Sequence, residues 1–240
     1  MSEPLRIALV AEGPTDRVVI SAALRVILSH RAFVLTQLQP ESSIVFKETG
    51  TGWVGVYRWC KQAAKRGFGR LAQDALLFQN YDLLILHVDA DVADMSYADG
   101  SIAQQPSDAP LPCACPCPPA SATTNALRSA VLSWGGDVAI PPRTVICMPS
   151  KSTEAWVVAA LFPGDQSIQQ GIECFANPES RLGQQPKKHR IRKKQRDYED
   201  RSAELSKAWP RLVEDGLLGE ARRFQREFLE QIAIVCGRPQ

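Results

Sequence analysis

Apolar residues along the chain form short continuous runs that alternate with longer segments of helical spacing. Five runs predict β-strands: LRIALVAEG (5–13), FVLTQLQP (33–40), SSIVFKE (42–48), YDLLILHVDAD (81–91) and RTVICMPS (143–150). The run at 81–91 is apolar nearly throughout until its aspartates, which is typical of a central parallel strand covered on both faces.

The segments between these runs predict helices, because their apolar residues recur at every third or fourth position. The predicted helices lie within residues 14–30, 48–67, 121–136, 152–162 and 216–237. Pro14 suits a first helical position, SATT (121–124) offers N-cap hydroxyls, and Gly135 with Gly136 suits a helix end. The alternation of strand and helix predicts an α/β fold with a mostly parallel sheet flanked by helices.

The composition changes after Pro163, which divides the chain into two parts. Residues 1–162 contain all the predicted strands and form the α/β domain, with a long loop at 95–120 that is rich in proline and small residues. Residues 163–240 contain no convincing strand. They are predicted to form a basic, helical C-terminal extension whose last helix packs back on the domain.

The composition is that of an ordinary globular protein. The chain has 240 residues, of which 45% are hydrophobic and 22% charged, enough for one sizeable core. No apolar run approaches the roughly 18 residues of a membrane span, and the N-terminal residues lack a signal-peptide pattern. We therefore expect a cytoplasmic protein that does not associate with membranes.

Seven cysteines occur, and three of them lie close together at Cys113, Cys115 and Cys117. In a cytoplasmic protein of this size they are expected to be thiols and not a disulfide framework. The alternating spacing differs from the paired spacing of common zinc sites, so we favour a loop with reactive thiols over a structural metal site.

Acidic residues follow three of the predicted strands. Glu12 follows the first strand, with Asp16 in the next helical turn; Asp89 and Asp91 end the strand at 81–91; and Glu154 follows the strand at 143–150. The carboxyl ends of parallel strands meet at one edge of a sheet, where ligands bind. A divalent cation, Mg²⁺ or Mn²⁺, would offset the repulsion among these acids. In an extended segment Asp89 and Asp91 would point the same way, whereas His87 is expected to be buried.

Structural roles could also account for these acids. Asp16 and Glu154 lie in first helical turns, where a carboxylate stabilises the helix. Asp89 and Asp91 could simply begin a loop. Their combination at one predicted edge favours a metal site over these separate roles.

The segments VAEGPTD (10–16) and HVDAD (87–91) resemble the two signature motifs of the Toprim superfamily, and the resemblance spans roughly residues 5–162. It implies a compact α/β fold that binds magnesium and handles phosphodiester bonds. Glu12 would then act in acid–base chemistry or metal binding, and Asp89 with Asp91 would bind metal. Asp16 would be a further acid of the nuclease members. The aspartate motif lacks the glycine that often follows it in topoisomerases and primases.

The segment PSKSTEAW (149–156) resembles small stand-alone bacterial Toprim-like proteins, some of them linked to phage defence. This resemblance makes Lys151 a candidate for stabilising transition-state charge and Glu154 a candidate for a further metal contact. The chain is too short to be a primase or to contain the ATPase domain of the related defence nucleases. The resemblance therefore implies a free-standing module, which could work with a partner protein such as a defence-system ATPase.

The extension contains the run KKHRIRKKQR, with seven lysines and arginines in ten residues. The candidate nucleic-acid-binding residues are Lys187, Lys188, Arg190, Arg192, Lys193, Lys194 and Arg196. Such a run can neutralise several phosphates of a nucleic acid, although a solvated loop is the alternative interpretation.

Together these features predict a Mg²⁺- or Mn²⁺-dependent nuclease that acts on DNA or RNA, with a role in antiviral defence by resemblance alone. Two alternatives stay open. The first is a module that binds metal and nucleic acid without cleavage, or a subunit activated by a partner. The second is phosphatase or nucleotidyl-transfer chemistry on a small substrate.

Overall fold

The structure is a computed structural model that describes residues 3–41, 50–103, 106, 109–186, 190–214 and 216–237. The strand predicted at 42–48 lies outside the described residues. So do Lys187 and Lys188 of the basic run.

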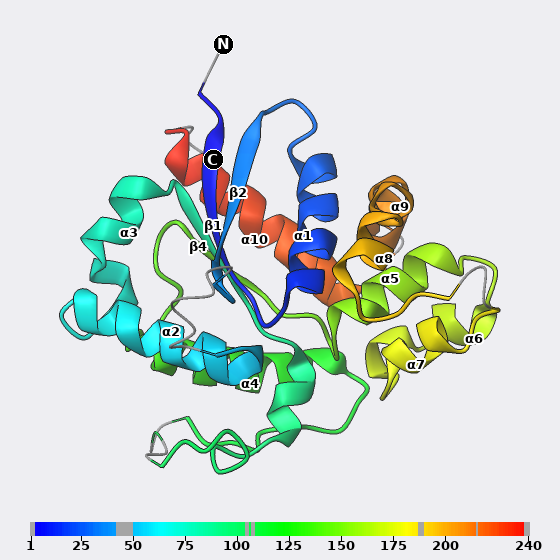
Figure 1. The fold of residues 1–240 in the computed structure, drawn as a ribbon, viewed down its shortest axis with the longest axis horizontal. Coiled ribbons are helices and arrows are strands. Elements are labelled where there is room, and N and C mark those ends of the chain that lie inside the picture. The colour runs from blue at the N-terminus through cyan, green and yellow to red at the C-terminus, as the bar shows by residue number, and fades with distance from the viewer. Residues whose placement is uncertain are drawn as a thin grey trace.

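Four parallel strands form the sheet, which confirms the predicted parallel α/β class (Figure 1). The strands are β1 (Leu5–Val10), β2 (Phe33–Gln39), β3 (Leu83–His87) and β4 (Thr144–Cys147), in the order β2-β1-β3-β4. Every residue of β3 is buried, as expected for an interior strand. All described pairings are parallel, so the carboxyl ends of the strands lie at one edge.

Helices cover both faces of this sheet. The helices are α1 (Pro14–Ile27), α2 (Gly52–Arg66), α3 (Ala75–Asn80), α4 (Ala120–Trp134), α5 (Thr153–Leu161), α6 (Gln166–Gln169), α7 (Pro178–Gly183), α8 (Gln195–Glu199), α9 (Ser202–Glu214) and α10 (Gly219–Val235), with 3₁₀ turns η1 (Leu71–Gln73), η2 (Ala90–Asp94) and η3 (Ile172–Cys174). Because side chains alternate along a strand, Ile7 and Leu9 join the core beneath α1, α5 and α10, whereas Ala8 and Val10 join the core beneath α2 and α4. The result is a three-layer arrangement.

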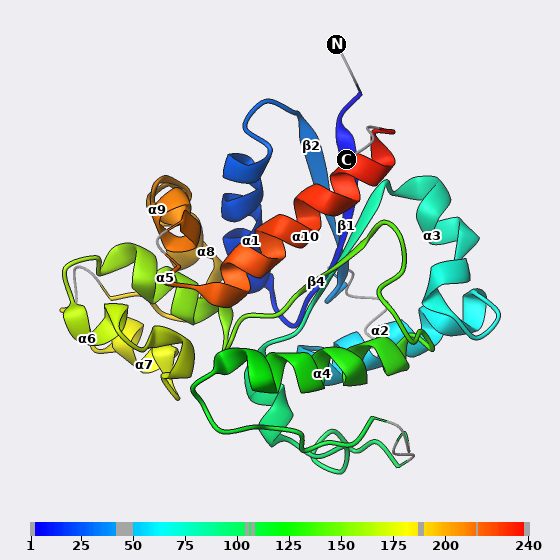
Figure 2. The ribbon, with the colours of Figure 1, turned by 180° about the vertical axis from the view of Figure 1, so that it is seen from behind.

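The C-terminal extension is helical, as predicted, and packs into the same core as the sheet. Figure 2 shows α10 running diagonally past the strands, and it contacts β3 and β4. Helix α5 is apolar on all sides, with Trp156 in T-shaped contact with Trp209 at 5.3 Å between ring centroids. A helix of this kind is stable only when it is buried on every side, and here α9 and α10 complete its burial.

The segment that leads from η2 to α4 is irregular where it is described, as predicted for the loop at 95–120. Tyr97 packs inward, and its hydroxyl donates to the Ala109 carbonyl at 2.9 Å. Helix α4 begins at Ala120 after Pro119, so the predicted N-cap in SATT is wrong. Because proline fixes a backbone angle suited to the approach of a helix, the helix starts before those hydroxyls.

The prediction that the cysteines are thiols is wrong for one pair. Cys117 and Cys174 form a disulfide, with their Cα atoms 5.6 Å apart. The two residues are 57 positions apart, and the fold brings the segment before α4 against η3. This bond removes one thiol from the proposed cluster, in which Cys113 and Cys115 are free.

Among the described helices, none is both long enough and apolar enough to cross a membrane.

Candidate metal centre at the carboxyl edge of the sheet

Three predicted acids lie together where the strands end. The Asp89 backbone N–H, just after β3, donates to Glu12 Oε1, just after β1, at 2.8 Å. Thr153 at the start of α5 links the others, because its N–H donates to Asp89 Oδ1 at 3.2 Å and its hydroxyl donates to Asp16 Oδ1 at 2.7 Å. Residues from four segments therefore meet in one hydrogen-bonded group.

Asp16 combines a structural role with a place in this group. Its Oδ2 accepts the Gly13 backbone N–H at 2.8 Å, which satisfies a donor at the start of α1. Its Oδ1 faces Thr153. The helix-capping role expected of a carboxylate at this position is thus present, and it fixes the direction of the side chain.

Glu12 lies beside the glycine turn that opens α2. The Gly52 N–H donates to the Glu12 carbonyl at 3.0 Å, and a Cβ atom at position 52 would lie 4.0 Å from Glu12 Oε2. Gly52 has a φ of +66°, a conformation that other residues rarely adopt. The turn therefore holds the backbone of Glu12 next to the end of β3.

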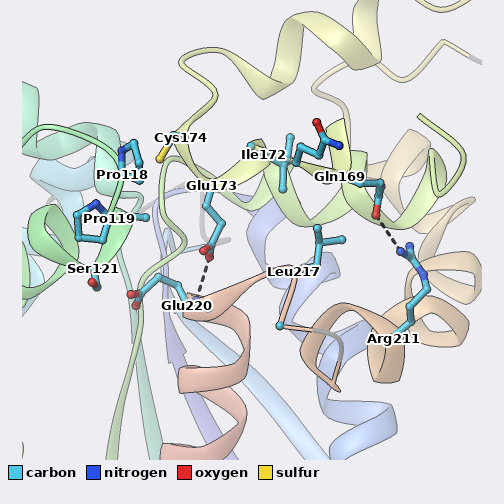
Figure 3. Close-up of a pocket in the computed structure, with 15 residues that line it drawn as sticks. Pro118, Pro119, Ser121, Gln169, Ile172, Glu173, Cys174, Arg211, Leu217 and Glu220 are labelled. Atoms are coloured by element: carbon cyan, nitrogen blue, oxygen red, sulfur yellow. Dashed lines mark hydrogen bonds between the residues drawn. The ribbon is translucent and has the colours of Figure 1, made fainter. Parts of the chain in front are cut away.

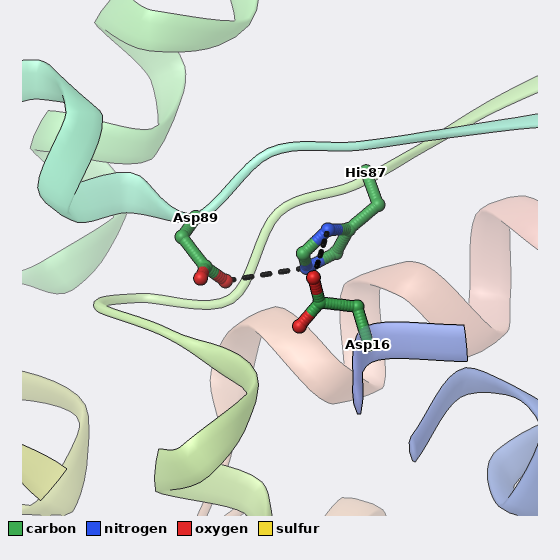
Figure 4. A group of neighbouring side chains, drawn as sticks. All are labelled: Asp16, His87 and Asp89. Carbon is green, nitrogen blue, oxygen red and sulfur yellow. Dashed lines mark ion pairs between the residues drawn. The ribbon is translucent and has the colours of Figure 1, made fainter. Parts of the chain in front are cut away.

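His87 is the residue whose role sequence reasoning missed. The imidazole is fully buried, as predicted, but it lies between two carboxylates (Figure 4). Its Nε2 is 3.2 Å from Asp89 Oδ1, and its Nδ1 is 3.8 Å from Asp16 Oδ2. Neither nitrogen makes a well-aligned hydrogen bond with any described group. The two-residue spacing of His87 and Asp89 was the available signal, because alternate strand residues share a face.

Asp91 departs from its predicted geometry. The chain turns into η2 directly after Asp89, so the two aspartates are not aligned along an extended segment. The Asp91 N–H donates to the Lys151 carbonyl at 3.1 Å, and its side chain is exposed. The Lys151 ammonium lies 3.8 Å from the carboxylate of Asp94, which is the last residue of η2. Asp91 and Lys151 therefore occupy the rim of the site.

Glu154 is 1% exposed and points toward the C-terminal extension. Its Oε1 accepts the Tyr198 hydroxyl at 2.7 Å and lies 3.7 Å from the Lys193 ammonium. Lys193 also lies 3.5 Å from Glu179 on α7. Glu154 thus anchors two residues of the extension, a role that the sequence did not indicate, and its contact with a metal stays a prediction.

The basic residues that the structure describes are exposed: Arg190, Arg192, Lys193, Lys194 and Arg196. A groove of about 510 Å³ runs beside them, lined by α7 and by residues 191–193. Lys193 therefore belongs both to this groove and to the acidic site.

Burial and mutual repulsion set the electrostatics of the site. Burial, reinforced by the charge of Asp89, raises the pKa of Glu12 well above its usual value. Burial also raises the pKa of Asp89, and the charges of Asp16 and Glu154 add to the effect. For Lys193 burial acts in the opposite direction, but the carboxylates of Glu154 and Glu179 prevail and raise its pKa. A cation at this centre would favour the ionised forms of Glu12 and Asp89, which burial and mutual repulsion disfavour.

We predict that the metal-free protein loses stability as the pH rises. The folded-state pKa values of Glu12 and Asp89 lie above their ordinary values of 4.5 and 3.8. Their contribution is fully present below about pH 4 and is lost as the pH rises through the raised pKa values. Thermal unfolding in chelator from pH 4 to pH 8 measures this effect. The Glu12→Gln variant should show a smaller loss than the wild type, and parallel curves would contradict the prediction.

A donor set for a cation is present at this point. One oxygen each of Asp16 and Asp89 and one nitrogen of His87 lie within 4.8 Å of one another. The orphaned imidazole nitrogens at the bottom of the group fit a metal ligand, since a buried polar atom without a partner is costly. Carboxylates with imidazole form a common ligand set for divalent ions.

A second pocket of about 580 Å³ lies elsewhere, between the Pro118–Pro119 segment, η3 and the start of α10 (Figure 3). Glu173 accepts the Glu220 N–H there at 3.0 Å, so its carboxylate satisfies a backbone donor in the first turn of α10. None of the predicted site residues lines this pocket.

Comparison of the chain with protein-family models, with curated proteins and with solved structures finds no match. Its function must therefore be argued from the site itself.

Proposed function

We propose that this protein is a divalent-metal-dependent nuclease that hydrolyses phosphodiester bonds in DNA or RNA. The observation that carries the proposal is the meeting of Glu12, Asp16 and Asp89 at the carboxyl edge of the sheet, with Lys193 of the basic segment beside them. An acidic centre next to an exposed basic segment suits a substrate that brings both a scissile phosphate and neighbouring phosphates.

Asp16 and Asp89, with His87, would hold a cation such as Mg²⁺ or Mn²⁺, and Asp91 lies at the rim for a further contact. When bound, the cation supplies positive charge that stabilises the charge developing on the phosphate oxygens. Glu12 suits proton transfer, because it lies beside Asp89 and because burial and the charge of Asp89 raise its pKa above the usual value of a carboxyl group.

Positive side chains would bind the phosphates. Lys193 is held near the centre by Glu154 and Glu179, so it suits the phosphate next to the scissile bond. Arg190, Arg192, Lys194 and Arg196 are exposed beside the groove and suit flanking phosphates. Lys151, at the rim with Asp91, is the second candidate for stabilising charge on the phosphate.

The resemblance to Toprim proteins supports this reaction type, and the parallel sheet is compatible with it. A role in antiviral defence, a partner such as a defence-system ATPase and a cytoplasmic location are parts of the same proposal, and they depend on that resemblance.

The test is cleavage of labelled plasmid, single-stranded DNA and structured RNA, each with Mg²⁺, with Mn²⁺ and with chelator. The proposal expects products on at least one polymer in the presence of metal and none in chelator. An Asp89→Ala, Asp91→Ala double variant controls for contaminating nucleases. Turnover of small phosphate esters alone would point instead to phosphatase or nucleotidyl-transfer chemistry.

Two observations favour a second candidate, a metal- and nucleic-acid-binding module without its own activity. Glu154 is engaged by Tyr198 and Lys193, and Asp91 is not aligned with Asp89. The candidate metal centre therefore has fewer carboxylate ligands than a site with two metal ions would need. A partner protein that moves Lys193 away from Glu154 would release a further ligand. Salt-sensitive nucleic-acid binding without cleavage would support this candidate.

We predict that Lys193→Ala lowers the cleavage rate by about 10²-fold, because it removes the positive charge nearest the acidic centre. The matched control is Lys194→Ala, which removes the same charge from the next residue and should change the rate less than about threefold while weakening binding. Single-turnover rates and binding at several salt concentrations separate the two effects. Equal losses of rate in both variants would mean that Lys193 only helps to bind the nucleic-acid backbone and does not stabilise charge at the scissile phosphate.

A further inference from the structure

The buried imidazole of His87 distinguishes this centre from a purely acidic one. It lies at the bottom of the group, fully buried, and neither ring nitrogen has a well-aligned hydrogen-bond partner among the described residues. Figure 4 shows the ring between Asp89 and Asp16. A buried imidazole whose nitrogens make no well-aligned hydrogen bond is costly, and coordination of an ion would satisfy one nitrogen.

The surroundings of the imidazole also limit how an ion could be held. The side chains of Asp16 and Asp89 are 5% and 10% exposed, so an ion among them would have lost much of its hydration shell. Mg²⁺ gives up water reluctantly and usually keeps several water ligands. First-row transition-metal ions accept imidazole nitrogen readily and bind mixed nitrogen and oxygen sites more tightly.

The two carboxylates that would bind the ion together with His87 are already oriented by hydrogen bonds. Asp89 Oδ1 accepts from the Thr153 N–H, and Asp16 is fixed by the Gly13 N–H and the Thr153 hydroxyl. Hydrogen bonds of this kind hold ligating carboxylates in place and tune metal affinity. The group is therefore preorganised before any ion arrives.

We infer that His87 is a metal ligand and that the centre selects a first-row transition-metal dication, such as Mn²⁺ or Zn²⁺, over Mg²⁺. The inference deepens the proposed function by naming the class of ion. Only the catalytic use of the ion rests on the proposed function. The competing interpretation is that His87 is an imidazolium that pairs with the two carboxylates and binds no metal.

The first experiment uses the unaltered protein loaded with Mn²⁺. Pulsed electron paramagnetic resonance detects the coupling of a nitrogen nucleus to the bound ion. We expect a ¹⁴N signal from one imidazole, and we expect the same signal in the His30→Asn variant, since His30 is exposed in the turn after α1. Bound Mn²⁺ without nitrogen coupling would overturn the inference, as would failure to bind Mn²⁺ at all.

The second experiment compares affinities by calorimetry with Mn²⁺ and Mg²⁺ as the probes. The wild type should bind Mn²⁺ at least about tenfold more tightly than Mg²⁺. In His87→Asn, checked for folding by circular dichroism, this ratio should collapse while the Mg²⁺ affinity changes little. An unchanged ratio in a folded variant would overturn the inference.

The outcomes separate this inference from the nuclease proposal. Nitrogen-coordinated Mn²⁺ in a protein that cleaves no nucleic acid would sustain the ligand assignment and refute the nuclease. Metal-dependent cleavage without nitrogen coupling would do the opposite.

Discussion

Replacement of Asp89 by asparagine is expected to reduce metal-dependent cleavage by about 10³-fold and, at the same time, to make the metal-free protein more stable. Asp89 contacts three other residues of the site, through the imidazole of His87, the N–H of Thr153 and its own N–H to Glu12. Loss of a cation's charge stabilisation is worth several kcal/mol, which corresponds to this loss of rate.

The gain in stability has a separate cause. Burial and the charges of Asp16 and Glu154 raise the pKa of Asp89, so the ionised carboxylate is unfavourable in the folded protein. We therefore expect the variant to have a higher free energy of unfolding than the wild type at pH 8 in chelator. Added Mn²⁺ should then stabilise the wild type and leave the variant unchanged.

Urea unfolding with and without Mn²⁺, together with single-turnover cleavage, measures both effects. Asp200→Asn is the matched control, since Asp200 is exposed at the end of α8 and the same substitution there should alter neither property. A variant that is destabilised in chelator would mean that Asp89 acts mainly as a structural hydrogen-bond acceptor for Thr153.

Loss of the Cys117–Cys174 disulfide should lower the free energy of unfolding by about 4 kcal/mol. The bond closes a loop of 57 residues, and a cross-link over such a length restricts the unfolded chain by about that amount. The loop contains α4, β4 and α5, so the bond constrains the strand and helix that lead to Glu154.

The Cys117→Ser, Cys174→Ser double variant tests this by urea unfolding, with and without reductant. Reductant should lower the stability of the wild type to that of the double variant and have no effect on the variant itself. Cys115→Ser removes a free, exposed thiol two positions away and should leave stability unchanged. Seven titratable thiols in the denatured, unreduced protein would show that the bond does not form.

The edge at which the acids meet could be predicted because it follows from local pattern and topology. Apolar runs that end at Glu12 and Asp89 predict parallel strands, and parallel strands end together. The structure agrees with that reasoning, including Pro14 at the start of α1. The geometry of Asp91 could not be predicted in this way, because the extended backbone stops at Asp89 and a 3₁₀ turn begins.

Contacts between distant segments account for the other differences. Tyr198 is 44 residues from Glu154, and Cys174 is 57 residues from Cys117; no local pattern links either pair. The sequence around each of these residues contains no signal that identifies its distant partner. The packing of the C-terminal extension against α5 brings Tyr198 to Glu154, and the approach of η3 to the segment before α4 brings Cys174 to Cys117.

The burial of α5 has a consequence for how the chain matures during translation. Thr153, the first residue of α5, orients Asp16 and Asp89, while Trp156 on the same helix needs Trp209 and Phe224 for its packing. Domains generally fold as units while the N-terminal part leaves the ribosome first. A nascent chain that has not yet reached α9 and α10 lacks the packing partners of Trp156, so we expect the acidic centre to be completed only after these two helices have been made. If the protein cleaves nucleic acid as proposed, this order would keep an unfinished chain inactive beside the ribosomal RNA and messenger RNA that produce it.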